Sequence, residues 1–380
     1  MSGSSPVRVV CVAGARPNFV KVAPLLRALR GSPSFETRLI HTGQHREACL
    51  SAVFFQDLAI PAPDVDLGIG SGTHAQQTGD MMKALEGVLC RLQPQVVVVV
   101  GDVNSSLAGA LVSAKLWLDA PFRTRLGARR RPLLAHVEAG LRSFDDDMPE
   151  EVNRRLIDTV ADVLYVTEPA GLANLTREGV PAHRAVLVGN VMIDSLQAVR
   201  DLAGRSRVLE ELGLTGPYGV VTLHRSGNVD DPETLRRLVG TLDELAKQLP
   251  LVFPVHPRTR ARLQASALRL DAPRWCVVDA LGYVPFLRLL EGARVVFTDS
   301  GGVQEETTVL GVPCLTLRDG TERPITVEQG TNRVVGTDPA AIAAGFRDAL
   351  AAGARGVVPA LWDGHAANRV VAHLEGLFAE

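Results

Sequence analysis

The chain has 380 residues, of which 40 are basic and 42 acidic, and its net charge is −2. This length exceeds what one hydrophobic core usually holds and is sufficient for two domains. Because the charges nearly balance and the basic residues form no run apart from Arg129–Arg131, we expect no nucleic-acid partner.

The cysteines and the apolar runs argue against disulfides, a metal centre and a membrane span. Five cysteines lie mostly in apolar strand or helix patterns and have no CxxC spacing, so we expect reduced core thiols in a cytoplasmic protein. The chain starts with only a short apolar stretch before a Gly-Ala-Arg-Pro turn, which indicates a first strand and not a signal peptide. The longest apolar run, Val96–Gly101, is far too short to cross a bilayer.

Short β-branched runs alternate with helical patterns along the first half of the chain. They are continuous apolar runs, which is typical of strands that helices cover on both faces. This pattern predicts a parallel, doubly wound sheet whose strands begin near Arg8, Thr37, Val96, Leu133 and Val163.

A second series of such runs predicts a second sheet, with strands that begin near Ala185, Gly219, Leu251, Trp275, Ala293 and Pro313. The expected fold class is therefore α/β, with two Rossmann-like, doubly wound parallel-sheet domains that face a cleft. We expect an N-terminal domain at residues 1–175, a C-terminal domain at residues 176–364 and a helix at residues 365–380.

In open parallel sheets, ligands bind at the carboxyl ends of the strands. The polar residues that follow the predicted strands are therefore candidates for the site: Arg16, His45, Asp102, Glu138, His224, His256 and Ser300. If the two sheets face each other, these side chains line a single cleft.

The segment Gly14–Lys21 leaves the first strand and enters a helix, with Arg16 and Lys21 near the helix start. Cations there oppose the helix dipole unless an anion neutralises them, so we interpret both as ligand-facing. The alternative is that water solvates both.

Two acidic residues end strands of the first half. Asp102 also begins a helix, so it is either a site carboxylate or a helix N-cap. Glu138 shares a strand face with His136 and has no cation beside it in the sequence, so burial would favour its protonated form, as suits proton transfer. The alternative for Glu138 is a structural ion pair with Arg142 or Arg154.

Glu150 is a third candidate carboxylate. Asp147-x-x-Glu150 has the pattern of a capping box, with a proline at the first helical position, and this would explain Glu150 without a function. Glu150 also shares a polar helical face with Asn153 and Arg154, and a second carboxylate near Glu138 would suit acid/base catalysis.

In the second half, His224 with Arg225 and His256 with Arg258 follow strands. A histidine at such a position can contact a phosphate as a cation or can transfer a proton, and a structural histidine is the alternative. Two such groups in one sheet favour anion binding.

The segment Val295–Leu317 predicts a buried strand, a Ser-Gly-Gly turn at residues 300–302, an acidic helix and another strand. Glycines at a helix start let an anion such as phosphate approach the backbone N–H groups. Glu305 and Glu306 follow, and because adjacent helical residues point roughly 100° apart, only one of them can face a ligand.

Arg323 precedes a proline in the loop after this segment, and such a rigid loop is suited to hold an arginine against a diphosphate. The sequence has no Walker, GxGxxG or HExxH motif, which argues against a P-loop enzyme, a dinucleotide oxidoreductase and a zincin. We expect neither a metal ion nor a cofactor.

Nine motifs cover the chain nearly end to end: GARPNFVKVAPL, HTGQHREA, GDVNSS, HVEAGLRS, PEEVNRRLID, GNVMIDSL, LHRSGNVD, DSGGVQEE and TERPITVEQGTN. In their order and spacing the chain resembles the bacterial non-hydrolysing UDP-N-acetylglucosamine 2-epimerases. The resemblance implies the glycosyltransferase B architecture, a homodimer, and a last helix that returns to the first domain.

The resemblance also implies a reaction. UDP would leave UDP-GlcNAc by anti elimination, and its re-addition to the 2-acetamidoglucal would give UDP-ManNAc. Asp102, Glu138, Glu150 and His224 would be catalytic, with His224 at the departing diphosphate. The residues that match UDP-sugar binding are Arg16, Lys21, His256, Ser300, Gly301, Gly302, Glu306 and Arg323, with Glu306 at the ribose.

Gln44, His45 and Arg46 correspond to a regulatory UDP-GlcNAc site of the family. The chain departs from the family pattern near this site and the nucleotide, with Asn18 where many members have glutamate and LHRSGN in place of LHRREN. Relatives also act on modified UDP-GlcNAc derivatives. The alternatives are a hydrolysing epimerase that releases UDP and ManNAc, and a glycosyltransferase of the same fold. The insertion at residues 119–131 is expected to form a surface loop.

Overall fold

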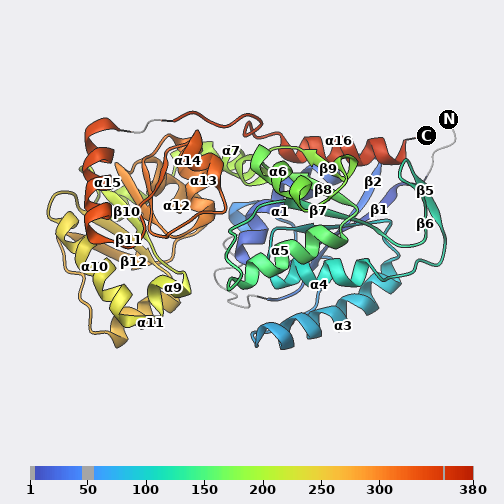
Figure 1. The fold of residues 1–380 in the computed structure, drawn as a ribbon, viewed down its shortest axis with the longest axis horizontal. Helices are drawn as coiled ribbons and strands as arrows, with labels where there is room; N and C mark the ends of the chain where they lie inside the picture. The colour runs from blue at the N-terminus through green and yellow to red at the C-terminus, as the bar shows by residue number, and fades with distance from the viewer. Residues whose placement is uncertain (1–4, 45–54, 354–355, 380) are drawn as a thin grey trace. The chain divides into compact units, whose positions relative to one another are not determined.

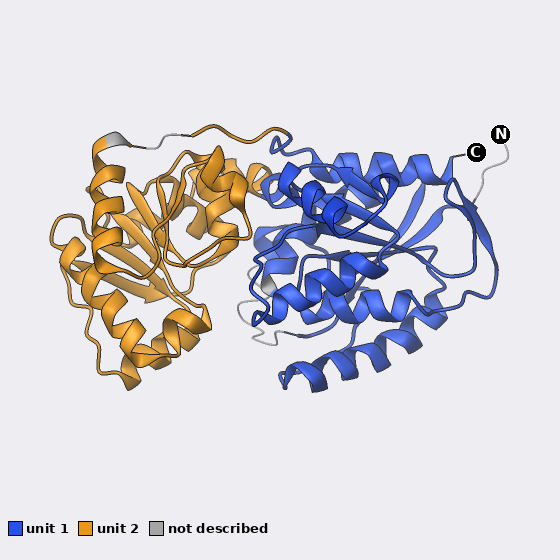
Figure 2. Ribbon diagram, viewed as in Figure 1, with its two compact units in different colours: residues 1–195, 361–380 blue, residues 196–360 orange. Residues whose placement is uncertain are grey.

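The computed structural model describes residues 5–44, 55–353 and 356–379. They form two compact units (Figure 2): unit 1 comprises residues 1–195 and 361–380, and unit 2 comprises residues 196–360. Each unit contains one large parallel sheet with helices packed on it (Figure 1). The prediction of two doubly wound parallel sheets is confirmed.

Unit 1 holds a seven-stranded sheet in the order β3-β2-β1-β4-β7-β8-β9. Its strands are β1 (Val7–Ala13), β2 (Phe35–His41), β3 (Val65–Asp66), β4 (Val96–Val100), β7 (Leu133–Ala139), β8 (Val163–Val166) and β9 (Ala185–Leu187). Its helices are α1 (Arg16–Gly31), α3 (His74–Leu92), α4 (Asn104–Ser113), α5 (Pro149–Val160), α6 (Pro169–Arg177), the short 3₁₀ helix η1 (Ala182–Arg184) and α16 (Ala366–Phe378). The helix α7 (Val191–Gly204) begins in unit 1 and ends in unit 2.

Unit 2 holds a six-stranded sheet in the order β12-β11-β10-β13-β14-β15. Its strands are β10 (Gly219–Thr222), β11 (Leu251–Val255), β12 (Trp275–Asp279), β13 (Val295–Thr298), β14 (Cys314–Thr316) and β15 (Asn332–Val334). Its helices are α8 (Val208–Glu211), α9 (Ser226–Val229), α10 (Pro232–Ala246), α11 (Pro257–Ala265), α12 (Tyr283–Glu291), α13 (Gly301–Leu310), α14 (Pro324–Glu328) and α15 (Pro339–Ala352).

Both sheets reverse their strand order at one point, which is where ligands bind in open α/β sheets. In unit 1 the order reverses between β1 and β4, and in unit 2 between β10 and β13. The valines Val96–Val100 of β4 are fully buried, as the continuous apolar run predicts. The residues that leave the carboxyl ends of these strands are therefore the ones best placed to contact a ligand.

One strand that the sequence assigned to the second sheet belongs to the first. β9 pairs in parallel with β8, with Ala185 opposite Leu164. The prediction was wrong because an apolar run indicates a buried strand but not the sheet in which that strand pairs. The compact units change at residues 195/196 and 360/361, whereas the sequence placed its boundaries at 175/176 and 364/365.

The helix α16 packs against α1 of unit 1 (Figure 1). The carboxylate of Asp194 accepts hydrogen bonds from the backbone N–H groups of Ala366 and Ala367, at 3.1 and 2.7 Å, and so caps the first turn of α16. A side chain from elsewhere in the chain thereby satisfies donors that a helix start leaves unpaired.

The insertion at residues 119–131 contains an antiparallel hairpin, formed by β5 (Phe122–Thr124) and β6 (Gly127–Arg129), where a loop was expected. Phe122 stacks on Phe378 of α16, with ring centroids 6.0 Å apart. Arg129 and Arg131 of the basic run both form ion pairs with Asp162. The run therefore contributes to the packing of unit 1.

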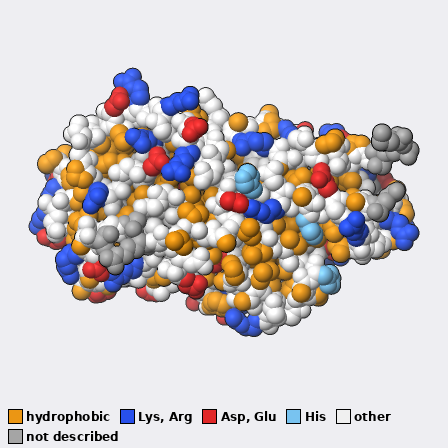
Figure 3. Space-filling model, turned by 90° about the horizontal axis from the view of Figure 1, so that it is seen from above, with side chains coloured by type: hydrophobic (Ala, Val, Ile, Leu, Met, Phe, Trp, Pro, Cys, Tyr) orange, Lys and Arg blue, Asp and Glu red, His pale blue; other side chains and the backbone are white. Residues whose placement is uncertain are grey.

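On the face that Figure 3 shows, basic and acidic side chains are interspersed among apolar and neutral ones. Cys11, Cys90, Cys276 and Cys314 are free thiols, and Cys49 lies outside the described residues. Among the helices that the structure describes, none combines the length and apolar character needed to span a membrane.

Candidate active site

Glu138 lies at an irregularity in β7. The register between β7 and β8 shifts between Val137 and Ala139, and the backbone of Glu138 has a φ of 74°. A residue other than glycine rarely adopts this conformation, which costs on the order of 1–3 kcal/mol and is concentrated at functional sites. The side chain is nevertheless buried, because Glu138 is only 5% exposed.

The side chain of Lys21 on α1 reaches Glu138, and Nζ forms a short ion pair with Oε2. Gly101 makes room for this pair, because a Cβ added there would lie 2.9 Å from Glu138 Oε2 and 3.5 Å from Lys21 Nζ. The sequence places no cation beside Glu138, but the fold brings Lys21, 117 residues away, into contact with it, so the alternative of an ion pair is correct in kind but not in its partner. Arg142 and Arg154 form their ion pairs with other carboxylates.

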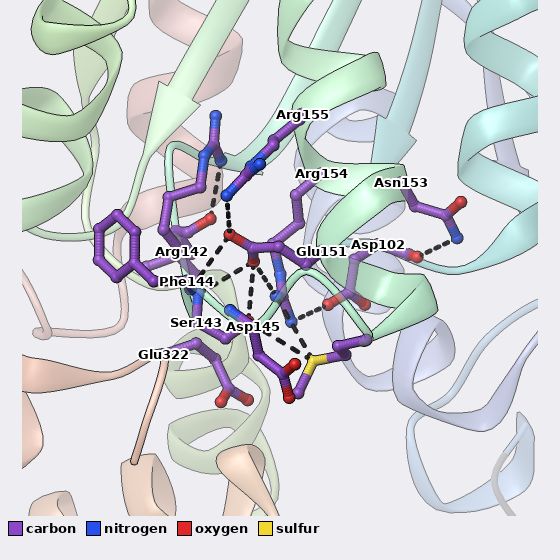
Figure 4. A network of polar contacts seen from close by, with 12 residues as sticks. Asp102, Arg142, Ser143, Phe144, Asp145, Glu151, Asn153, Arg154, Arg155 and Glu322 are labelled. Carbon is purple, nitrogen blue, oxygen red and sulfur yellow. Dashed lines mark hydrogen bonds and ion pairs between the residues drawn. The ribbon is translucent and has the colours of Figure 1, made fainter.

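Asp102 follows Gly101 at the carboxyl end of β4, and its side chain faces that of Arg154 (Figure 4). Arg154 of α5 donates from Nη2 to Asp102 Oδ2 at 2.6 Å, and Asn153 donates to the backbone oxygen of Asp102 at 2.7 Å. The N-cap of α4 is Val103, and no side chain caps that helix. The interpretation of Asp102 as an N-cap was therefore wrong, and its carboxylate is held by an arginine.

Glu150 and Glu151 are neighbours in the first turn of α5. The N-cap of this helix is Met148, with no side-chain cap, so the capping box predicted from Asp147 and Glu150 does not form. Glu150 is half-buried, and within the described part of the chain its carboxyl group makes no hydrogen bond or ion pair. Glu151, which the sequence did not single out, is 1% exposed and contacts Arg154.

His136, two residues before Glu138 in β7, is fully buried and contacts both α5 and the residue that follows β4. Its Nδ1 lies 2.7 Å from Asp158 Oδ1, and its Nε2 lies 3.1 Å from the carbonyl oxygen of Gly101. Burial alone would raise the pKa of Asp158, but His136 and Arg142 hold that pKa below its ordinary value. The imidazole ring thereby connects β7 with α5, which carries Asp158, and with Gly101 after β4.

The other predicted residues of unit 1 lie near the start of α1 and after β2. Arg16 is the first residue of α1, and its side chain is outside the described part of the structure. Gln44 accepts hydrogen bonds from the backbone N–H and the hydroxyl of Ser105, at 3.0 and 2.7 Å. His45 and Arg46 lie outside the described residues.

In unit 2, His224 and Asp299 meet where the strand order reverses. His224 Nδ1 lies 2.8 Å from Asp299 Oδ1, and the backbone N–H groups of His224 and Arg225 both donate to Asp299 at 3.0 Å. Burial alone would raise the pKa of Asp299, but the charge of His224 and these donors hold it below its ordinary value. The His224 side chain is 43% exposed, so Asp299 orients a ring that solvent can reach.

The sequence missed Asp299, although its position directly after a strand was the signal that selected the other candidates. His256 is the N-cap of α11 and accepts from the backbone N–H of Arg258 at 3.3 Å. Its ring centroid lies 6.4 Å from that of His224. The two histidines that the sequence predicted at strand ends therefore lie close together.

The turn at residues 300–302 leads from β13 into α13, and Ser300 is the N-cap without a side-chain cap. A Cβ at Gly301 would lie 2.6 Å from Glu322 Oε1, so the close approach of this carboxylate requires glycine there. Gly302 is half-buried in the first turn. The backbone donors of this helix start point at the carboxyl end of the sheet, where an anion can bind.

Glu305 and Glu306 have different surroundings in α13. Arg323 lies with its Nε 2.6 Å from Glu305 Oε1, and both side chains are buried. Burial raises the pKa of Glu306 to about 8, and the charge of Glu305 adds to this rise while a hydrogen bond with Tyr283 opposes it. Arg323, predicted to contact a diphosphate, thus has a carboxylate partner in this structure.

The candidate residues divide between the units. Unit 1 brings together Lys21, Asp102 and Glu138 with Arg154, beside the helix start that carries Glu150. The predicted residues of unit 2 are His224, His256, Ser300, Gly301, Gly302, Glu306 and Arg323. Among the residues that the structure describes, no cluster of three or more His, Cys, Asp or Glu side chains could hold a metal ion.

Known proteins are similar to this chain in sequence and in fold. The chain is 40% identical to a UDP-N-acetylglucosamine 2-epimerase of Methanocaldococcus jannaschii over 339 residues, which cover 87% of this chain and 88% of that protein. It is also 40% identical over 335 residues to the UDP-2,3-diacetamido-2,3-dideoxy-D-glucuronate 2-epimerase of Pseudomonas aeruginosa, with the same coverage of 87% and 88%.

Comparison with solved structures gives matches to the same family and to a wider fold class. The crystal structure of the M. jannaschii UDP-GlcNAc 2-epimerase in complex with UDP-GlcNAc and UDP matches with a TM-score of 0.86 and 37% identity, over 97% of this chain and 99% of that one. A calicheamicin glycosyltransferase, 14% identical, matches with a TM-score of 0.55 over 98% of each chain and shares the fold alone. The sequence pattern described as UDP-N-acetylglucosamine 2-epimerase matches residues 27–375. The chain belongs to the UDP-N-acetylglucosamine 2-epimerase family.

Proposed function

We propose that this protein interconverts UDP-GlcNAc and UDP-ManNAc by eliminating and re-adding UDP. The observation that carries the proposal is the pair of cation-held carboxylates, Asp102 with Arg154 and Glu138 with Lys21, at one sheet edge of a member of this family. Inversion at C2 requires that a proton leaves one face of the sugar and returns to the other, which calls for acid/base groups on both faces, and carboxyl groups can fill these roles.

The proton on C2 is not activated by a carbonyl group, and one general base contributes only about 10² to 10⁴ in rate. Departure of UDP from C1 must therefore precede or accompany removal of the proton. The electron pair of the C2–H bond then forms the C1=C2 bond, and the pair of the C1–O bond leaves with UDP. Ionised carboxylates beside C1 stabilise the positive charge that develops there.

The cation partners suggest a division of roles. Asp102 and Glu138 form ion pairs with Arg154 and Lys21, and carboxylates held in this way are suited to accept a proton and to stabilise charge at C1. Glu150 is half-buried and without such a partner in the described residues, which suits it to carry a proton. In the reverse direction each group takes the opposite role.

Unit 2 is proposed to hold the nucleotide. The start of α13 at Ser300 offers backbone donors for the diphosphate, and His224, oriented by Asp299, adds a donor at the same sheet edge. Glu306 is proposed as the ribose ligand. Because Arg323 is held by Glu305, its contact with the diphosphate requires that this ion pair opens or that a second donor of the guanidinium is used.

Incubation with UDP-GlcNAc in D₂O without an acceptor tests the proposal. Epimerisation places deuterium at C2 of intact UDP-GlcNAc and UDP-ManNAc, which mass spectrometry and proton NMR detect. Free sugar with UDP identifies a hydrolysing epimerase instead, and intact substrate without deuterium contradicts both reactions.

A second substrate class follows from one relative. The P. aeruginosa relative is as similar to this chain, at 40% identity, as the M. jannaschii relative is. The same assay with UDP-2,3-diacetamido-2,3-dideoxy-D-glucuronate decides between the two sugars by comparing kcat/KM. A higher value for the diacetamido sugar assigns this protein to the modified substrate.

We also propose a homodimer. Large apolar side chains are exposed on unit 1, among them Trp117 at 73%, Phe144 at 63% and Val152 at 47%. Exposed apolar side chains favour contact with a second chain where they form a contiguous patch. Light scattering coupled to gel filtration measures the mass in solution, and a monomer at micromolar concentration contradicts the proposal.

A further inference from the structure

Glu151 is the buried neighbour of the half-buried Glu150. Its Oε2 accepts hydrogen bonds from the backbone N–H of Ser143 at 2.9 Å, from the Ser143 hydroxyl at 3.0 Å and from Arg154 at 2.7 Å. Burial alone would raise the pKa of Glu151, but the backbone of Ser143 and the charge of Arg154 hold it below its ordinary value. Glu151 is thus an ionised carboxylate whose bonds all lead into the protein.

Arg154 uses two different nitrogens for two carboxylates (Figure 4). Nη1 donates to Glu151 and Nη2 donates to Asp102 Oδ2 at 2.6 Å, and the arginine side chain is only 4% exposed. A guanidinium group is a rigid planar fork, so a partner on Nη1 fixes the direction in which Nη2 points. Glu151 therefore determines the orientation of the cation that holds Asp102.

Glu151 also ties down the loop that follows Glu138. Its Oε1 accepts from the backbone N–H of Phe144 at 3.3 Å, and Phe144 has a φ of 57°, a strained conformation for a bulky residue. The surrounding structure must maintain such a conformation, and the two backbone bonds to Glu151 provide part of that constraint.

We propose that Glu151 is a positioning residue for the reaction, which sets the geometry of Asp102 through Arg154 without contacting the substrate. This inference rests on the proposed function, because it assigns Asp102 to the chemistry. Of the two adjacent glutamates, Glu150 then faces the reaction and Glu151 maintains the arrangement around it.

The isosteric variant Glu151→Gln tests the inference. It keeps the size of the side chain and one acceptor oxygen, replaces the other oxygen with a donor-only NH2 group, and removes the charge that holds Arg154. We expect kcat for deuterium exchange to fall by about 10- to 100-fold, as small misplacements of catalytic groups do, with unchanged affinity for UDP in calorimetry. Glu151→Asp, which restores the charge, should recover part of kcat. A variant with a lower melting temperature but unchanged kcat per folded molecule overturns the proposal.

A double-mutant cycle with Arg154→Lys locates the effect. If Glu151 acts through Arg154, the kcat of the double variant equals that of Arg154→Lys alone. If the two residues have independent roles, the fold-losses in kcat of the two single variants multiply in the double variant. Arg155→Gln is the matched control, because Arg155 is a second and more distant partner of Glu151, at 3.6 Å, and its side chain is 45% exposed. That control should retain full activity.

Crystal structures of the wild type and Glu151→Gln give a readout that does not depend on turnover. We expect Arg154 Nη2 to lie outside hydrogen-bond distance of Asp102 in the variant, and an unchanged contact overturns the proposal. If the wild type fails to exchange deuterium while the crystal structures behave as expected, the proposed function is wrong and the positioning of Asp102 by Glu151 stands.

Discussion

Lys21 Nζ contacts Glu138 Oε2 in the interior of unit 1, although 117 residues separate the two in the sequence. Their side chains are 10% and 4% exposed, so neither charge is solvated by bulk water. A buried charge that loses its partner is costly, which makes this pair sensitive to substitution of either member.

We expect Lys21→Met to lower the rate of deuterium exchange at least 100-fold and to destabilise unit 1 by about 3–5 kcal/mol, because it leaves the Glu138 carboxylate buried without its cation. Chemical denaturation and the exchange assay measure the two effects. Lys83, exposed on α3, provides the control Lys83→Met. If Lys21→Met instead weakens UDP binding at unchanged kcat, Lys21 contacts the diphosphate as the sequence suggested.

Gly101→Ala should inactivate the protein through Glu138. The new Cβ would lie 2.9 Å from Glu138 Oε2, and Gly101 has a φ of 66°. Gly179 is a control that separates the steric contact from the backbone strain. Its φ is 79°, like that of Gly101, but a Cβ added there would meet no atom within 4 Å. Gly179→Ala should therefore cost about 1 kcal/mol of stability, as a strained backbone does, and retain activity. Equal activity of the two variants contradicts a role for the space at Gly101.

Asp299→Asn should disturb His224 without unfolding unit 2. The amide can still accept from the backbone of His224 and Arg225, but it no longer provides the charge beside the imidazole ring. We expect a loss of about 10²-fold in kcat, typical of removing one electrostatic contribution. Asp279→Asn is the control, since that carboxylate is 95% exposed. Activity of Asp299→Asn at the wild-type level would show that His224 needs no orienting partner.

Glu306 gives stability a specific pH dependence. Its pKa is raised from 4.5 in the unfolded chain to about 8 by burial, so the folded state binds a proton that the unfolded state has lost between these values. The stabilisation is complete below pH 4.5 and is lost as the pH rises toward 8, with a slope of at most about 1.4 kcal/mol per pH unit. Urea unfolding of Glu306→Gln between pH 5 and 8 should lack this decline. A parallel decline in the variant assigns the dependence to another group.

The sequence predicted the central strands well because continuous apolar runs report burial on both faces. It did not predict β3 (Val65–Asp66) or β15 (Asn332–Val334), since edge strands of two or three residues leave no periodic pattern. Asp102 and Glu138 were found because residues after strands of a parallel sheet converge.

The partners of these carboxylates could not be predicted. Lys21 and Arg154 lie 117 and 52 residues from Glu138 and Asp102, and only the packing of α1 and α5 on the sheet brings them close. The backbone conformation of Glu138 was likewise hidden, because a bulge leaves no signal in one sequence. Glu151 was not selected, because the sequence alone does not show which of two adjacent helical glutamates lies in the interior.

The cap that Asp194 provides for α16 has a consequence for the order in which the two units can fold during translation. Residues 361–379, which complete unit 1, are translated after the whole of unit 2. The sheet that carries Asp102 and Glu138 therefore emerges from the ribosome first but lacks its covering helix while residues 196–360 are made. Unit 2 is continuous in the sequence and can fold during that interval, so the unit that begins first is completed second.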